Sequence, residues 1–249
     1  MKKISILKQA KDIQTLGQKN LWVIYGKSGS GKTTLASTFP KPLLYLSIED
    51  DGSNTIADVS GIRGLKITNL EELNSVLDEL IDTKTDYKTV VLDTFSFIVN
   101  IFMENNSKKN RPLSGYTLWG TLADETQALI KKCKFIAESK NVILTCHEVM
   151  KVVDGMESEI TPHTRPNVSP AAQSYLEGMS NFGIHCTVIT KDVKNKEGKL
   201  VEVSKHAVHL SQNQYYWAKT QKPASIIVPK ILLDPTYSKI MKILKGETQ

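Results

Sequence analysis

The residues best suited to chemistry form one eight-residue segment, Gly26-Lys27-Ser28-Gly29-Ser30-Gly31-Lys32-Thr33. The segment fits the phosphate-binding pattern G-x-x-x-x-G-K-[S/T] at every fixed position. Glycines allow backbone N–H groups to converge on a phosphate, and the start of a following helix adds positive potential. The pattern predicts that Lys32 contacts the β- and γ-phosphates of a nucleotide and that the Thr33 hydroxyl binds Mg²⁺. Nucleotide binding is therefore expected along the whole segment and at Thr34.

The sequence on either side of this loop supports that interpretation. An apolar run over residues 21–25 precedes it, as expected of a buried parallel strand. Residues 34–39 can begin a helix, which Pro40 ends. A flexible turn rich in Gly and Ser is the alternative, but it does not require a strand before the loop and a helix after it.

Acidic residues follow two further apolar strands. Residues 89–92 lead into Asp93, which we expect to hold Mg²⁺ directly or through water; a helix cap is the alternative. Residues 42–48 end in a run of three acids that begins with Glu49. Because ligands of an open α/β sheet lie outside the carboxyl ends of its strands, Glu49 is expected to face the nucleotide. A solvated acidic turn closed by Gly52 is the alternative.

A fourth apolar strand, residues 141–146, ends at His147. At that strand end we expect His147 to lie near the γ-phosphate and to sense it by hydrogen bonding, although an ordinary histidine is the competing interpretation. Residues 149–168 show no periodicity, so we predict a long loop. Loops of that length are usually functional or disordered, and nucleotide state could change the order of this one.

Residues 104–115 are polar, basic and rich in turn formers, which predicts a second loop. Its basic residues stand just before Tyr116 and Trp119, a combination that suits single-stranded nucleic acid. A plain solvated loop is equally compatible with the pattern. For Trp119 itself we favour a position in the core, anchoring the next helix.

The remaining patterns predict one α/β domain over residues 1–249, with an N-terminal extension (1–20) and a C-terminal tail (223–249). Helices are expected over 70–81 (capped by Asn69), 121–140, after Ser169 and over 234–244, and a strand pair over 182–190 and 200–210.

Composition narrows the class of protein. The 249 residues carry a net charge of +6, which is compatible with a polyanionic partner or with a solvated basic surface. No apolar run approaches the length of a membrane span, and the N-terminus does not resemble a secretory signal. The three cysteines lie in apolar surroundings, as reduced buried thiols of a cytoplasmic protein would.

Over residues 20–222 the chain resembles the RecA-like P-loop ATPases, most closely the small phage-encoded RecA-like proteins assigned to single-strand annealing and recombination. The resemblance implies a RecA-like core, with a mostly parallel sheet flanked by helices and an antiparallel C-terminal extension. It also implies hydrolysis of ATP with Mg²⁺. Glu49 then matches the glutamate that activates the attacking water, Asp93 the Mg²⁺ ligand, and His147 the polar sensor.

The resemblance also implies partners. The two DNA-binding loops of RecA-like recombinases would fall near residues 104–116 and 148–168, where the candidate contacts are Lys108, Lys109, Arg111, Lys151 and Arg165. The segment Lys219-Thr220-Gln221 resembles the Lys-x-Arg with which RecA-fold helicases reach a neighbouring subunit's nucleotide. Gln221 replaces that arginine, which leaves Lys219 for the role. The resemblance therefore implies that the protein binds single-stranded DNA, assembles with identical subunits into a ring or filament, and interacts with a single-strand binding protein. It also implies a location in the cytoplasm of a phage's host.

Two other functions share the nucleotide residues. A helicase-type or helicase-loading motor would use the same loop, Glu49 and Asp93. A small-molecule phosphotransferase would need a lid rich in arginine, yet Arg63, Arg111 and Arg165 are the only arginines in the sequence.

Overall fold

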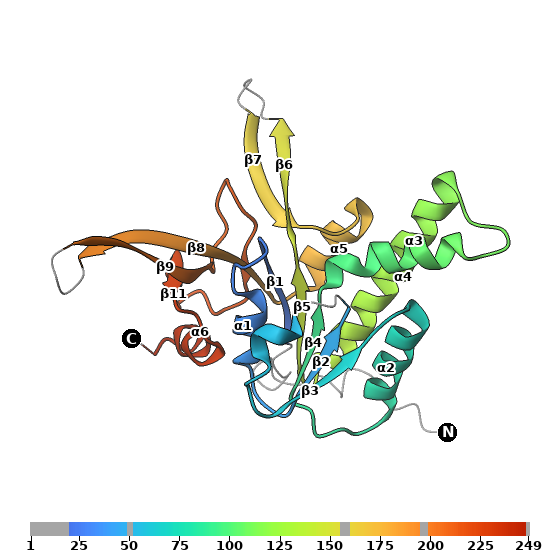
Figure 1. Ribbon diagram of the computed structural model, residues 1–249, viewed down its shortest axis with the longest axis horizontal. Helices are drawn as coiled ribbons and strands as arrows, with labels where there is room; N and C mark the ends of the chain where they lie inside the picture. Colours follow the sequence, from blue (N-terminus) through green and yellow to red (C-terminus); the bar gives the residue numbers. More distant parts are fainter. Residues whose placement is uncertain (1–19, 49–51, 155–159, 195–198, 248–249) are drawn as a thin grey trace, which may run out of the picture.

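The computed structural model describes residues 20–48, 52–154, 160–194 and 199–247. A nine-stranded sheet forms its centre (Figure 1). The parallel strands are β1 (Leu21–Gly26), β2 (Leu43–Ser47), β3 (Ile62–Lys66), β4 (Thr89–Asp93), β5 (Asn141–Cys146) and β8 (Phe182–Lys194). The antiparallel strands are β9 (Leu200–His209), β10 (Lys219–Thr220) and β11 (Ile231–Leu233). The order is β11-β9-β8-β1-β5-β4-β2-β3, with β10 also paired to β8.

Helices cover both faces of this sheet, which explains why its central strands are largely apolar. In β1, Leu21, Val23 and Tyr25 enter the core beneath one helical layer, whereas Trp22 and Ile24 enter the core beneath the other. The first layer consists of α2 (Leu70–Asp82), α3 (Ile98–Ser107), α4 (Gly115–Ile136) and α5 (Pro170–Met179). The second contains α1 (Lys32–Ser37) and α6 (Tyr237–Leu244). Short 3₁₀ turns, η3 (Ser53–Ile56) and η4 (Phe95–Phe97), follow β2 and β4.

These observations confirm the predicted fold class: a mostly parallel sheet flanked by helices, with antiparallel strands in the C-terminal part. The predicted cap of α2 is also confirmed, because the Asn69 side chain accepts a hydrogen bond from the backbone N–H of Glu72. Ser169 does precede α5, but its hydroxyl makes no capping hydrogen bond. The predicted single domain over 1–249 stays a prediction.

The prediction of a long loop over residues 149–168 is wrong. Most of this segment forms an antiparallel hairpin, β6 (Glu148–Asp154) and β7 (Ile160–Pro166), which projects beyond the carboxyl ends of the sheet (Figure 1). Pro162 and Pro166 concealed the second strand, since proline cannot donate to a central ladder. The ribbon tolerates both prolines because β7 forms a full ladder only with β6, and its other edge carries one bridge, from Thr164 to Tyr216.

The core position predicted for Trp119 is also wrong. Helix α4 begins at Gly115, six residues before the predicted start, so Trp119 lies in its second turn. Trp119 is 55% exposed and Tyr116 is 99% exposed. The connection between α3 and α4 therefore shrinks to residues 108–114, and two aromatic side chains stand in solvent directly after it.

Candidate nucleotide-binding site

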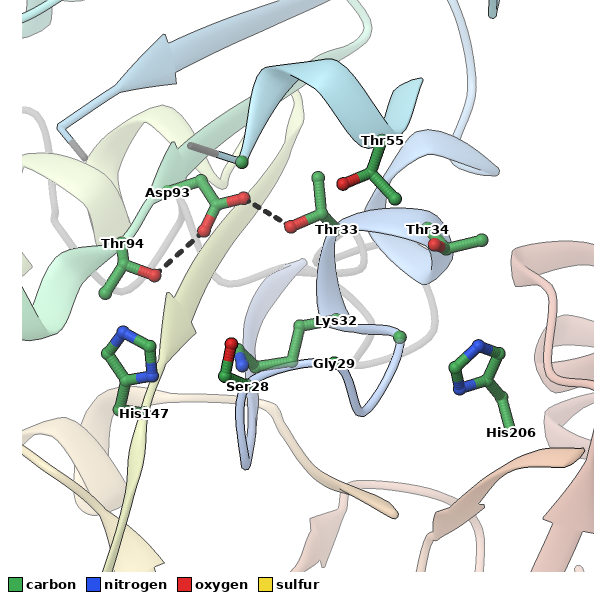
Figure 2. A pocket seen from close by; sticks show the side chains of 12 residues that line it. Ser28, Gly29, Lys32, Thr33, Thr34, Thr55, Asp93, Thr94, His147 and His206 are labelled. Carbon is green, nitrogen blue, oxygen red and sulfur yellow. Dashed lines mark hydrogen bonds between the residues drawn. The ribbon is translucent and has the colours of Figure 1, made fainter. Parts of the chain in front are cut away.

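A pocket lies at the carboxyl ends of the central parallel strands (Figure 2). The loop between β1 and α1 and the first three residues of α1 together supply half of its lining. The end of β4, the segments after β2, β4 and β5, and strand β9 supply the rest. The lining residues are Ser28, Gly29, Gly31, Lys32, Thr33, Thr34, Gly52, Thr55, Asp93, Thr94, His147 and His206.

The conformation of the loop requires its glycines. Gly29 and Gly31 have φ angles of +74° and +88°, in the left-handed region that favours glycine. A Cβ atom on Gly26 would lie 2.3 Å from the carbonyl oxygen of Cys186 on β8, so a side chain has no room there. Lys32 is only 7% exposed, and its Nζ donates to the carbonyls of Gly26 (3.0 Å) and Lys27 (2.8 Å). The loop's own backbone thus holds the Lys32 ammonium at the pocket.

Asp93 contributes a carboxylate with several hydrogen bonds to the pocket lining. It is 5% exposed. Its Oδ2 accepts from Thr33 Oγ1 (2.7 Å) and from the Tyr45 hydroxyl (2.7 Å). Its Oδ1 accepts from Thr94 Oγ1 (2.9 Å) and from Thr145 Oγ1. Hydrogen bonds from four hydroxyl groups fix the orientation of a charge that burial would otherwise destabilise.

The Thr33 and Asp93 oxygens fit a shared Mg²⁺. Adjacent ligands of an octahedral Mg²⁺, each about 2.0–2.1 Å from the ion, stand about 2.9 Å apart. The two protein oxygens are 2.7 Å apart and face the same pocket. One hydroxyl and one carboxylate, with the remaining positions left for phosphate and water, form the donor set that Mg²⁺ usually takes in nucleotide sites.

Two partners of Asp93 were not identified from the sequence. Tyr45 comes from β2 and Thr145 from β5, the strands on either side of β4. Both side chains are buried within strands that are mostly aliphatic. The only sign of them in the sequence is a polar side chain within a mostly apolar strand. That sign points to Asp93 only once the strand order places β2 and β5 beside β4.

His147 lies where the pocket meets the β6–β7 hairpin. Its ring lines the pocket beside Thr94, and its backbone N–H donates to Ser96 Oγ (3.0 Å). Its carbonyl accepts from the backbone N–H of Asn167, just after β7 (2.7 Å). The site predicted at Glu49 lies outside the described residues; Gly52, three positions later, lines the pocket.

A second cluster links strand β1 to the hairpin. The Tyr25 hydroxyl donates to the carbonyls of Thr164 on β7 (3.2 Å) and of Trp217. His185 Nε2 lies 3.0 Å from Glu148 Oε2 at the start of β6. Burial lowers the pKa of His185, although Glu148 opposes that shift. The cluster begins one residue before the phosphate-binding loop, so the base of the hairpin is anchored next to that loop.

Lys219 contacts a helix end of its own chain. Its Nζ donates to the carbonyls of Glu177 (2.9 Å) and Gly178 (3.0 Å), near the C-terminus of α5. Burial lowers its pKa. Lys219 does not line the pocket of its own chain. Its predicted reach into a neighbouring subunit stays a prediction.

The candidate DNA contacts fall in two separate projections (Figure 1). Lys108, Lys109 and Arg111 are exposed at the α3–α4 tip, where Lys108 pairs with Glu104 (2.7 Å). Arg165 lies on β7, with its Nη1 3.7 Å from Glu177 Oε2. Lys151 is on β6, and its side chain lies outside the described part of the structure. The structure does not bring these two groups into one site.

Comparison with known protein families agrees with the class that the fold and the pocket define, a P-loop ATPase with an α/β core. Residues 18–221 match the family model described as "AAA domain", and the chain belongs to that family. Among solved structures it is similar to the subject of "Structural and biochemical analysis of a prototypical ATPase from the type III secretion system of pathogenic bacteria". Identity is 12%, coverage is 68% of this chain and 51% of that chain, and the TM-score is 0.43. The chain thus spans about half of that ATPase. No curated protein matches the sequence.

Among the residues that the structure describes, no helix is both long and apolar enough to cross a membrane.

Proposed function

We propose that the protein hydrolyses ATP with Mg²⁺ in the pocket formed by the Gly26–Thr33 loop. The hydrogen bond between Thr33 and Asp93 carries the proposal, because it joins the two oxygen ligands that Mg²⁺ would need. Bound Mg²⁺ would neutralise charge that develops on the phosphates. Lys32 then contacts the β- and γ-phosphates, Glu49 orients or deprotonates water for in-line attack, and His147 senses the γ-phosphate.

Phosphate release from ATP in the presence of MgCl₂ tests the proposal. Lys32→Ala removes the ammonium held in the loop and should reduce release to background, while circular dichroism shows an intact fold. Lys245→Ala removes the same charge from an exposed position just after α6 and should leave release unchanged. Undiminished release by Lys32→Ala would overturn the assignment.

We further propose that single-stranded DNA is the partner and that the protein promotes annealing or homologous recombination, as part of a ring or filament. The α3–α4 tip supports this proposal, because Lys108, Lys109 and Arg111 are exposed there. Tyr116 and Trp119 are exposed in the first turns of α4, beside these charges. Cations for the backbone and aromatic rings for the bases are the groups with which proteins bind single strands.

The β6–β7 hairpin, which carries Lys151 and Arg165, supplies the coupling in this proposal. It begins at Glu148, one residue after His147, and its base is tied to β1 through Tyr25. A shift of His147 on phosphate binding would therefore act directly on the start of the hairpin. Hydrolysis would in this way change how tightly the hairpin binds the DNA.

Binding of a fluorescent single-stranded oligonucleotide at several salt concentrations tests the DNA proposal. Neutralising Lys108, Lys109 and Arg111 together should weaken binding and reduce the salt slope by about 2, since each lost phosphate contact contributes about 0.7. Neutralising three exposed lysines elsewhere, Lys230, Lys242 and Lys245, removes the same charge and should leave the slope nearly unchanged. Identical slopes for the two triple variants would reject the α3–α4 tip as the binding surface.

A further inference from the structure

His206 forms the wall of the nucleotide pocket on the side away from Asp93 (Figure 2). It comes from β9, a strand outside the parallel part of the sheet. Asp93, Thr94 and His147 stand together on the other side of the loop, and Thr34 lies between the two sides, near His206. The sequence alone gave no reason to place His206 in the site.

The imidazole ring lies against the turn of the phosphate-binding loop. A Cβ atom on Gly31 would lie 2.9 Å from His206 Nδ1 and 3.0 Å from its Cγ. The glycine therefore permits close approach of the ring as well as the positive φ of +88°. A larger residue at position 31 would displace the ring from the pocket.

Neighbouring strands fix the backbone of His206 while the residue remains exposed. His206 pairs with Val188 on β8, and its carbonyl accepts a hydrogen bond from the backbone N–H of Asp234 after β11 (2.8 Å). The strand therefore places the ring beside the loop and leaves it a surface available to a ligand.

The direction of a bound nucleotide follows from the proposed function, on which this inference rests. The Mg²⁺ ligands Thr33 and Asp93 mark the end of the pocket that receives the β- and γ-phosphates. A nucleotide that extends along the loop then directs its α-phosphate and nucleoside away from Asp93. That direction leads past Thr34 to His206.

We propose that His206 binds the nucleoside half of the nucleotide, with its imidazole ring packed against the base. Aromatic rings bind bases by stacking, because every base presents a π-face. The β8–β9 hairpin thereby becomes part of the nucleotide site, through a residue that contacts no phosphate.

Calorimetric binding of two ligands tests the inference: Mg·ATP, and Mg²⁺ with inorganic tripolyphosphate, which has no nucleoside. His206→Ala should weaken ATP binding by roughly 5- to 150-fold, the range given by loss of a base–aromatic stack. It should leave tripolyphosphate binding unchanged. His206→Phe keeps a ring and should retain most of the ATP affinity. Glu202→Ala, at an exposed position on the same strand, is the matched control and should change neither affinity.

Two results would overturn the inference alone. One is unchanged ATP affinity in His206→Ala, and the other is an equal loss for tripolyphosphate, which would place the ring on the phosphates. Failure of the proposed function gives a different result: the wild-type protein would bind neither ligand, and Lys32→Ala would change nothing.

Discussion

Removing one oxygen atom from Tyr45 should weaken Mg²⁺ binding, although Tyr45 is not itself one of the proposed metal ligands. The Tyr45 hydroxyl donates to Asp93 Oδ2 at 2.7 Å, the same oxygen that accepts from Thr33. Tyr45 is 2% exposed, so water cannot readily replace the lost donor. Tyr45→Phe keeps the ring and its packing, and changes only the support of the Asp93 carboxylate.

The structure permits an estimate of the effect. A hydrogen bond to a charged group contributes about 1.5–3 kcal/mol, and every 1.4 kcal/mol corresponds to about tenfold in an equilibrium constant. Loss of a partner that orients a metal ligand typically reduces metal affinity by about 10- to 100-fold. Three hydroxyl donors to Asp93 remain in the variant, which favours the lower half of that range. We therefore expect the Mg²⁺ concentration at half-maximal ATP hydrolysis to rise about 10- to 30-fold.

The assay is phosphate release at saturating ATP over a titration of MgCl₂. The rate at saturating Mg²⁺ should recover most of the wild-type value, because the ligands themselves are intact. Tyr116→Phe makes the same chemical change at a side chain that is 99% exposed, and its Mg²⁺ dependence should match that of the wild type. A Tyr45→Phe titration that overlays the wild-type curve would refute the role given to this hydroxyl.

Three further predictions concern the loop and the cluster behind it. Gly26→Ala should destabilise the protein and abolish ATP binding, as thermal melts and calorimetry would show, since its Cβ would overlap the Cys186 carbonyl; a soluble variant with wild-type affinity would contradict this. Because burial lowers the pKa of His185, the unfolded state binds more protons at mildly acidic pH, so the free energy of unfolding should fall as the pH drops below about 6.5. His185→Gln should flatten that pH dependence in denaturant titrations, and an unchanged slope would reject the assignment. Tyr25→Phe should speed amide hydrogen exchange in β6 and β7, because the hydrogen bond to Thr164 is lost; unchanged protection would show that the hairpin does not depend on it.

The parts of the site that could be predicted are those written in local sequence. The spacing of the glycines and of the Lys-Thr pair predicts the phosphate-binding loop. The apolar strand that precedes Asp93 predicts its place at the site. Parallel strands buried on both faces are continuous apolar runs, so their existence and the mixed α/β class also follow from sequence. The helix over residues 70–82 follows from its periodicity and from the Asn69 cap.

The remaining parts depend on strand order and on exposure, which local sequence does not contain. Tyr45 and Thr145 meet at Asp93 only because β2 and β5 flank β4 in the sheet. His206 reaches the loop because β9 pairs antiparallel with β8, the neighbour of β1 in the sheet. Trp119 illustrates the problem of exposure, since a tryptophan on an amphipathic helix is usually buried, whereas this one stands beside a basic tip.

The most direct test of the account is phosphate release from ATP by the wild-type protein and by Asp93→Asn, each measured with MgCl₂ and with EDTA. The amide keeps the shape of the carboxylate but removes the charge that faces Thr33. The account predicts release by the wild-type protein with MgCl₂, and release near background in the other three cases. Phosphate release by Asp93→Asn at the wild-type rate would contradict the proposed Mg²⁺ site and the mechanism built on it. Release by the wild-type protein that persists in EDTA would contradict them equally.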